Sequence, residues 1–128
     1  MNLVYRQIDP RSPIPLYVQI ADRLRVAIAT GELAAGAALP SVRNLASTIR
    51  VNPATVVQAY RELEQAGVVE SRQGAGTFVR ELPESRRESE RRREALRLVR
   101  GLMQEAAALG VGTEDLEHAW RTEFKERS

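Results

Sequence analysis

Residues 41–63 read SVRNLASTIRVNPATVVQAYREL, a stretch with two helix-start signals separated by one short turn. Ser41 can begin a helix over residues 42–49, because its hydroxyl can accept a hydrogen bond from a backbone amide in the first turn. Asn52 followed by Pro53 is the second signal, since proline in the first helical position lacks only a donor that would be unsatisfied anyway. The stretch therefore predicts two short helices joined by a tight turn, a helix-turn-helix.

The segments on either side complete this unit. Apolar residues recur at helical spacing over residues 15–30, which predicts a helix before the pair. The second helix of the pair should end at Gly67. Beyond it, two short β-prone runs at 68–72 and 77–80 flank a glycine-rich turn and predict a hairpin. The helices and the hairpin together predict a winged helix-turn-helix over residues 1–82.

Residues 83–128 form a second predicted region, which begins where Pro83 breaks the pattern. This region predicts a long helix over residues 84–109 and a final helix after Gly112. Apolar residues of both helices are expected to meet a second copy of the chain: Ala95, Val99, Leu102, Ala106, Leu109, Trp120 and Phe124. The expected fold is mainly α with a small β-hairpin, a winged helix-turn-helix followed by a short C-terminal helical dimerisation region.

The composition argues against several classes of function. The 128-residue chain has no cysteine, so neither a disulfide nor a thiolate metal site is available. A single histidine and the lack of any nucleophile arrangement argue against an enzyme, and no cofactor or metal is expected. The N-terminus lacks the apolar run of a signal peptide, and no stretch is long enough to cross a membrane. We therefore expect a cytoplasmic protein without membrane contact.

Charge is divided unevenly along the chain. Residues 1–80 carry nine arginines and six acidic residues, whereas the remainder carries ten basic and eleven acidic residues. A basic first part suits a polyanion such as double-stranded DNA, and a balanced second part suits solvent and protein contacts. The arginine-rich stretch at 86–93 is better interpreted as an ion-paired helix than as a nucleic-acid tail, because glutamates precede arginines by three residues there.

Candidate DNA contacts lie in three places. Arg43, on the polar face of the first helix of the pair, can donate two hydrogen bonds to guanine or hold a phosphate. At the start of the next helix, Thr55 and the backbone amides suit a phosphate, while Gln58 could read adenine. The hairpin tip adds polar side chains beside glycines that allow a close backbone approach. The candidate DNA-binding residues are Arg43, Asn52, Pro53, Ala54, Thr55, Val57, Gln58, Arg72, Gln73 and Gly74.

Several motifs resemble the GntR family of bacterial regulators. They lie within residues 13–80 and include Pro15-Leu16-Tyr17, Leu39-Pro40-Ser41-Val42-Arg43, Val51-Asn52-Pro53, Ala59-Tyr60-Arg61-Glu62-Leu63-Glu64 and Arg72-Gln73-Gly74-Ala75-Gly76-Thr77-Phe78-Val79. The short helical C-terminal part resembles the YtrA-type subfamily. The resemblance implies a homodimeric repressor that binds an inverted repeat. It also implies that Arg43 reads a base, that residues 52–55 and Val57 are recognition-helix contacts, and that Gly74 is the wing tip.

Two features depart from that family pattern. Arg50 stands in the turn where many relatives have glycine, and a left-handed backbone there would cost an arginine about 1 kcal/mol. The helix after the turn also lacks arginines that other branches of the family use.

Two alternatives to a sequence-specific DNA-binding regulator stay open at the level of sequence. A small-molecule-responsive sensor would bind its ligand at the dimer interface, because two short helices alone hardly enclose a drug-sized cavity. A nonspecific architectural protein would bind DNA but would not resist bulk competitor DNA.

Overall fold

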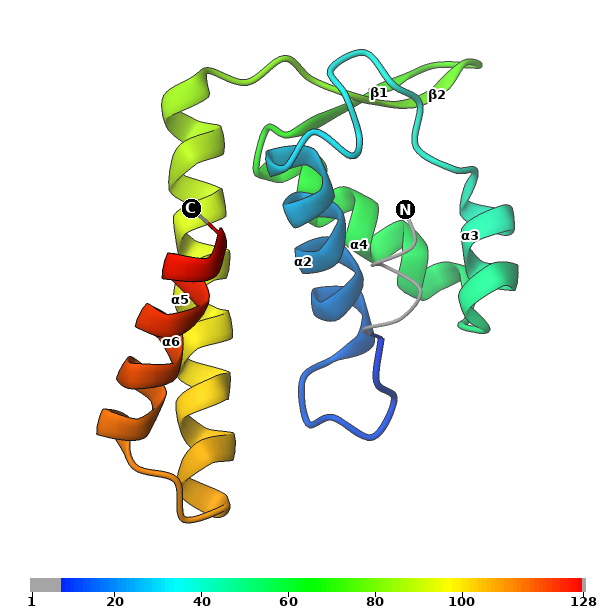
Figure 1. Ribbon diagram of the computed structural model, residues 1–128. Coiled ribbons are helices and arrows are strands. Elements are labelled where there is room, and N and C mark those ends of the chain that lie inside the picture. Colours follow the sequence, from blue (N-terminus) through cyan, green and yellow to red (C-terminus); the bar gives the residue numbers. More distant parts are fainter. Residues whose placement is uncertain (1–7, 128) are drawn as a thin grey trace. The chain divides into compact units, whose positions relative to one another are not determined.

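The computed structural model describes residues 8–127, so part of the N-terminal arm lies outside the described residues. The elements follow one another in the order α2 (Leu16–Ala29), α3 (Val42–Ile49), α4 (Pro53–Gln65), β1 (Val69–Arg72), β2 (Gly76–Val79), α5 (Glu84–Ala108) and α6 (Thr113–Arg127) (Figure 1). The chain divides into two compact units, and the division lies between Arg91 and Arg92, within α5. The predicted fold class, mainly helical with one small hairpin, is confirmed.

The core of the first unit is formed by apolar side chains of α2, α3, α4 and the β1–β2 hairpin. Ile20 and Leu24 of α2 are fully buried, as are Val56 and Leu63 of α4. The Tyr60 hydroxyl donates a 2.7 Å hydrogen bond to the Pro40 carbonyl oxygen, which ties α4 to the segment before α3. Each helix therefore buries one apolar stripe and leaves its other face exposed.

Local signals set the ends of α3 and α4 as the sequence predicts. The Ser41 hydroxyl accepts a 3.1 Å hydrogen bond from the Asn44 amide, and the Asn52 side chain accepts a 2.9 Å bond from the Ala54 amide. Between the helices, Arg50 adopts the left-handed conformation with φ of 58°. Because only this short turn separates the helices, the start of α4 is fixed firmly against α3.

The hairpin is antiparallel, with Val69 opposite Val79 and Arg72 opposite Gly76. A third segment supports it, since the Leu39 amide donates to the Thr77 carbonyl oxygen at 2.8 Å. The Val79 amide likewise donates to the Ala37 carbonyl oxygen at 2.8 Å. The hairpin is therefore held by the loop between α2 and α3, which places a supported wing beside the helix-turn-helix.

The first turns of α5 are bonded to the ends of other helices in the first unit. The Arg86 guanidinium donates to the Ala66 carbonyl oxygen at the end of α4. Arg91 donates to the carbonyl oxygen of Ala29, the last residue of α2, at 3.2 Å. Carbonyls at helix ends lack partners within their own helix and carry partial negative charge, so arginine suits them.

Glu84 differs from its predicted pairing. The three-residue spacing predicts Glu84 beside Arg87, but its carboxylate accepts a 2.8 Å hydrogen bond from Arg91. This hydrogen bond and the charge of Arg91 lower the pKa of Glu84 below its usual value. Arg87 instead donates to the Leu82 carbonyl oxygen. The backbone carbonyls that orient the two arginines are thus five positions away for Arg87 and 62 positions away for Arg91. The three-residue spacing does not encode either contact.

The second unit contains the remainder of α5, a turn at residues 109–112, and α6. The helix α6 begins at Thr113, directly after Gly112, as the sequence predicts. Its first turn is closed by the Asp115 carboxylate, which accepts a 3.3 Å hydrogen bond from the Gly112 amide. Among the described residues, α6 buries no side chain, and Ala106 is the buried residue of α5.

No helix in the described part of the chain is long and apolar enough to cross a membrane.

Candidate nucleic-acid interface

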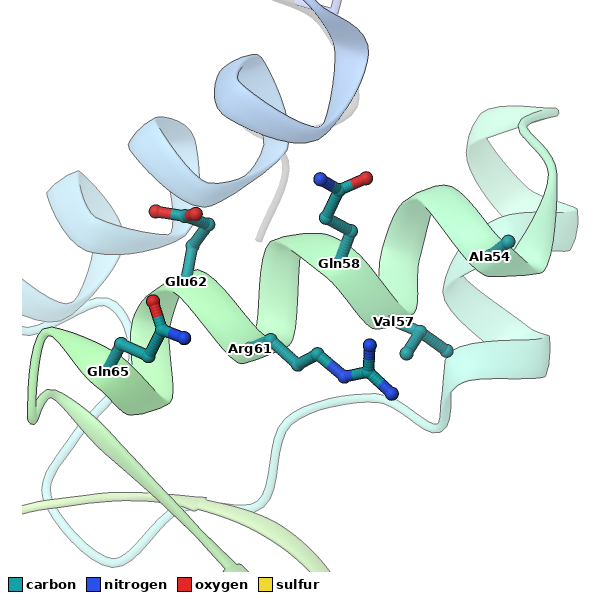
Figure 2. A pocket seen from close by; sticks show the side chains of 6 residues that line it. All are labelled: Ala54, Val57, Gln58, Arg61, Glu62 and Gln65. Carbon is teal, nitrogen blue, oxygen red and sulfur yellow. The ribbon is translucent and has the colours of Figure 1, made fainter.

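The exposed face of α4 begins at its capped N-terminus. Ala54 and Gln58 are exposed and Val57 is half-buried, and Figure 2 shows these three side chains in succession along the helix. All three are among the DNA-binding residues that the sequence predicts. In a major groove, the Gln58 amide can form hydrogen bonds with adenine, and the Ala54 and Val57 methyl groups can contact the methyl group of thymine.

The backbone amides at this helix start are less available than the sequence suggested. The Ala54 amide donates to the Asn52 side chain at 2.9 Å, and the Thr55 amide donates to the Asn52 carbonyl oxygen at 2.9 Å. Pro53 has no amide hydrogen. A phosphate at this end would therefore rely on the half-buried Thr55 side chain more than on these amides.

Arg43 is exposed near the start of α3. Within residues 8–127 the structure gives its side chain no hydrogen bond and no ion pair. A guanidinium without an internal partner keeps its full set of donors for a base edge or a phosphate.

The arginine of the wing, Arg72, has internal partners among the described residues, unlike Arg43. Arg72 donates to the Glu70 carboxylate through Nε at 3.1 Å and through Nη2 at 2.8 Å. Its guanidinium also lies over the Phe78 ring, 4.4 Å from the ring centre. These contacts fix the orientation of Arg72 and partly neutralise its charge. Its neighbours Gln73 and Gly74 are exposed, and Gly74 has φ of 77° with open space around its α-carbon.

Arg61 continues the exposed stripe of α4 beyond the residues that the sequence analysis selected. A hollow of about 620 Å³ lies along this stripe and is lined by Ala54, Val57, Gln58, Arg61, Glu62 and Gln65. The four-residue spacing from Val57 to Arg61 and from Arg61 to Gln65 is the signal that could have found them.

The predicted dimer seam is exposed at most of its positions. The exposed fractions are 46% for Val99, 50% for Leu102 and 73% for Leu109. Trp120 and Phe124 are also exposed, with ring centres 4.6 Å apart. Ala95 is exposed, whereas Ala106 is only 5% exposed and is packed within its own chain.

Sequence reasoning missed further exposed apolar residues in this unit. They are Leu96, Leu98, Met103 and Val111. Seam residues such as Ala95, Val99 and Leu102 are spaced four and three residues apart. This spacing picks out only the central positions of a seam, so apolar residues that flank it fall outside the pattern. The described residues contain no cluster of histidine and acidic side chains that could hold a metal ion.

Comparisons with known proteins identify the family. Residues 16–79 match the model of the bacterial regulatory proteins of the gntR family. The HTH-type transcriptional repressor YtrA of Bacillus subtilis is 47% identical over 75 residues, which cover 59% of this chain and 58% of that protein. The match therefore spans less than two thirds of this curated relative.

Solved structures extend the similarity to most of the chain. A GntR family transcriptional regulator from Listeria monocytogenes has 33% identity and a TM-score of 0.67, over 90% of this chain and 97% of the other. YtrA from Sulfolobus acidocaldarius, a GntR-family transcription factor, has 36% identity and a TM-score of 0.57, over 75% and 95% of the two chains. The similar proteins are transcription regulators rather than enzymes. The chain belongs to the GntR family of bacterial regulatory proteins and is a transcriptional regulator with a winged helix-turn-helix.

Proposed function

We propose that the protein is a sequence-specific repressor that binds an inverted-repeat operator as a homodimer in the cytoplasm. The observation that carries this proposal is the exposed face of α4, which starts at a capped helix end and presents Ala54, Val57 and Gln58. In a winged helix-turn-helix the second helix of the pair enters the major groove by its N-terminal part. Similar proteins named as repressors include YtrA of Bacillus subtilis and MngR of Escherichia coli.

Each group on the DNA-binding surface has a separate task in this proposal. Arg43 donates a pair of hydrogen bonds to a guanine, and Gln58 bonds an adenine. Thr55 contacts a phosphate and fixes the register of α4 on the duplex. The wing contributes Gln73 and the backbone at Gly74 next to the DNA backbone, with Arg72 held in position by Glu70 and Phe78.

Exposed apolar surface in the second unit supports a homodimer. The helix α6 buries no residue among those described, yet it exposes Trp120 and Phe124, and α5 exposes Leu102. Large apolar side chains left exposed in this number favour a protein partner. A second copy is the simplest partner, because two-fold pairing also matches the symmetry of an inverted repeat. Residues 83–128 are therefore proposed as the dimerisation region and residues 1–82 as the DNA-binding domain.

The test is selection of DNA by the purified full-length chain, followed by competition with random duplex. Enrichment of an inverted repeat, with binding that resists a large excess of random duplex, is the expected result. Ultracentrifugation of the complex should give two protomers for each operator. Equal displacement by operator and random duplex would instead identify a nonspecific architectural protein, and one protomer for each operator would contradict the dimer.

A small-molecule-responsive sensor is the alternative function. Thermal shift measurements with candidate ligands would separate it from a repressor without an effector, because a ligand that binds the folded state raises the melting temperature.

A further inference from the structure

Arg61 is the one basic residue in α4, whose sequence is PATVVQAYRELEQ. It is exposed, and within the described residues no hydrogen bond or ion pair is recorded for its side chain. Such a cation can bind an external anion without first breaking an internal contact.

The side chain of Arg61 extends toward the N-terminal part of α4. Figure 2 shows its guanidinium beside Val57, while Glu62 extends from a different side of the helix. Helical side chains lean toward the N-terminus of their helix, which explains the direction. The charge of Arg61 therefore lies next to the surface proposed to read bases, and the neighbouring carboxylate does not cover it.

The position of Arg61 along α4 decides which part of DNA it meets. It follows Pro53 by eight residues, which corresponds to about 12 Å along the helix axis. The major groove is about 8.5 Å deep and about 12 Å wide. When α4 enters with its first turn at the base edges, the Arg61 backbone lies near the rim of the groove, where the phosphates are. Ala54, Val57 and Gln58 carry no charge, so they supply no attraction for that rim.

Resting on the proposed DNA-binding function, we infer that Arg61 contacts a backbone phosphate at the rim of the major groove. It is a positioning residue, because this contact limits how deeply and at what angle α4 enters the groove. Phosphate contacts fix register and orientation but carry no sequence information. Arg61 thus complements the base contacts proposed for Arg43 and Gln58.

The experiment measures affinity against salt concentration for the full-length chain, on its operator and on random duplex. The variants are Arg61→Ala and Arg61→Lys, with Arg127→Ala as a charge-matched control, since the Arg127 side chain is 84% exposed near the end of α6. Alanine at an exposed helical position keeps the helix stable, and circular dichroism will verify the fold of each variant.

For Arg61→Ala, we expect the log–log salt slope to fall by about 0.9 for each protomer. Affinity should fall about fivefold for each half-site at physiological salt, by the same factor on operator and random duplex. Arg61→Lys should keep the wild-type slope, because lysine also neutralises a phosphate. Arg127→Ala should keep both slope and affinity.

Three results would overturn this inference. An unchanged slope in Arg61→Ala would mean that Arg61 touches no phosphate. Loss of sequence preference in both Arg61 variants would make it a base reader, because only a guanidinium pairs with guanine through two bonds in a fixed fork. If Arg127→Ala lowered the salt slope and the affinity as much as Arg61→Ala, the effect would come from net charge and not from a contact of Arg61. If the wild type binds random duplex as well as its operator, the proposed function fails, but the slope on random duplex still tests Arg61.

Discussion

At the scale of single residues, Arg50 keeps a left-handed backbone conformation that costs conformational free energy. Its φ of 58° lies in the left-handed region that glycine enters freely and other residues avoid. The turn must adopt this conformation so that α3 can end and α4 can begin within three residues. Its exposed side chain is available for a phosphate, which would give the arginine a use that glycine lacks.

We predict that Arg50→Gly raises the free energy of unfolding by about 1 kcal/mol, because glycine removes the left-handed strain. Urea denaturation should show a higher midpoint with an unchanged slope. If Arg50 also holds a phosphate, the same variant will bind DNA more weakly while it folds more stably. A lower stability than wild type would show that the Arg50 side chain makes contacts that outweigh its backbone strain.

Arg43→Ala tests base reading at the same scale. The substitution should remove a paired contact worth about 1–3 kcal/mol for each half-site. Operator affinity should collapse, whereas binding to random duplex should fall only slightly. Competition footprinting compares the two, and Asn44→Ala, at the neighbouring exposed position of α3, is the matched control. An undiminished operator footprint would remove Arg43 from the base-reading surface.

At the scale of elements, the first turns of α5 are part of the first compact unit. Arg86 and Arg91 donate to the last carbonyls of α4 and α2, respectively. The compact unit accordingly continues to Arg91. A basic side chain at a helix C-terminus offsets its partial negative charge and supplies the partner that its carbonyls lack.

We predict that Arg86→Ala lowers the free energy of unfolding by about 1–2 kcal/mol, since it removes a charged hydrogen bond to a helix end. Arg93→Ala, which removes an exposed arginine from the same helix, should change stability by less than about 0.5 kcal/mol. A fragment of residues 1–92 should likewise melt above a fragment of residues 1–82. Equal melting temperatures for the two fragments would show that the arginine contacts do not contribute to stability.

At the scale of the whole molecule, the proposed function gives the two compact units separate tasks. The first supplies a supported helix-turn-helix and wing, and the second exposes a face that a single chain leaves uncovered. Dimerisation would let one DNA-binding unit hold the other close to its half-site, at an effective concentration of about 1 mM. Tight operator binding should therefore depend on residues that never touch DNA.

Leu102→Glu tests this dependence, because Leu102 is half exposed on α5. A charge there should convert the dimer to a monomer, which sedimentation equilibrium will detect, and the monomer should bind the two half-sites independently. Gln104→Glu adds the same charge at an exposed polar position of α5 and should leave the dimer intact. A dimeric Leu102→Glu variant with wild-type operator affinity would assign the C-terminal helices another purpose.

The sequence by itself determined the elements whose signals are local. Ser41 and Asn52 act within a few residues of their own position, so the starts of α3 and α4 could be predicted. The buried stripe of α4 followed from helical periodicity. The glycine-rich turn indicated the hairpin, and motif resemblance indicated the family, which the comparisons confirm.

Only the tertiary structure decided contacts between residues distant in sequence. Arg91 and Ala29 are 62 positions apart, and no periodicity relates an arginine to a carbonyl at that separation. Sequence spacing likewise does not predict that the loop between α2 and α3 supports the wing. Nor does it predict that Ala106 is buried within its own chain. The physical reason is that a long, flexible arginine can reach many partners, and packing of the folded helices selects among them.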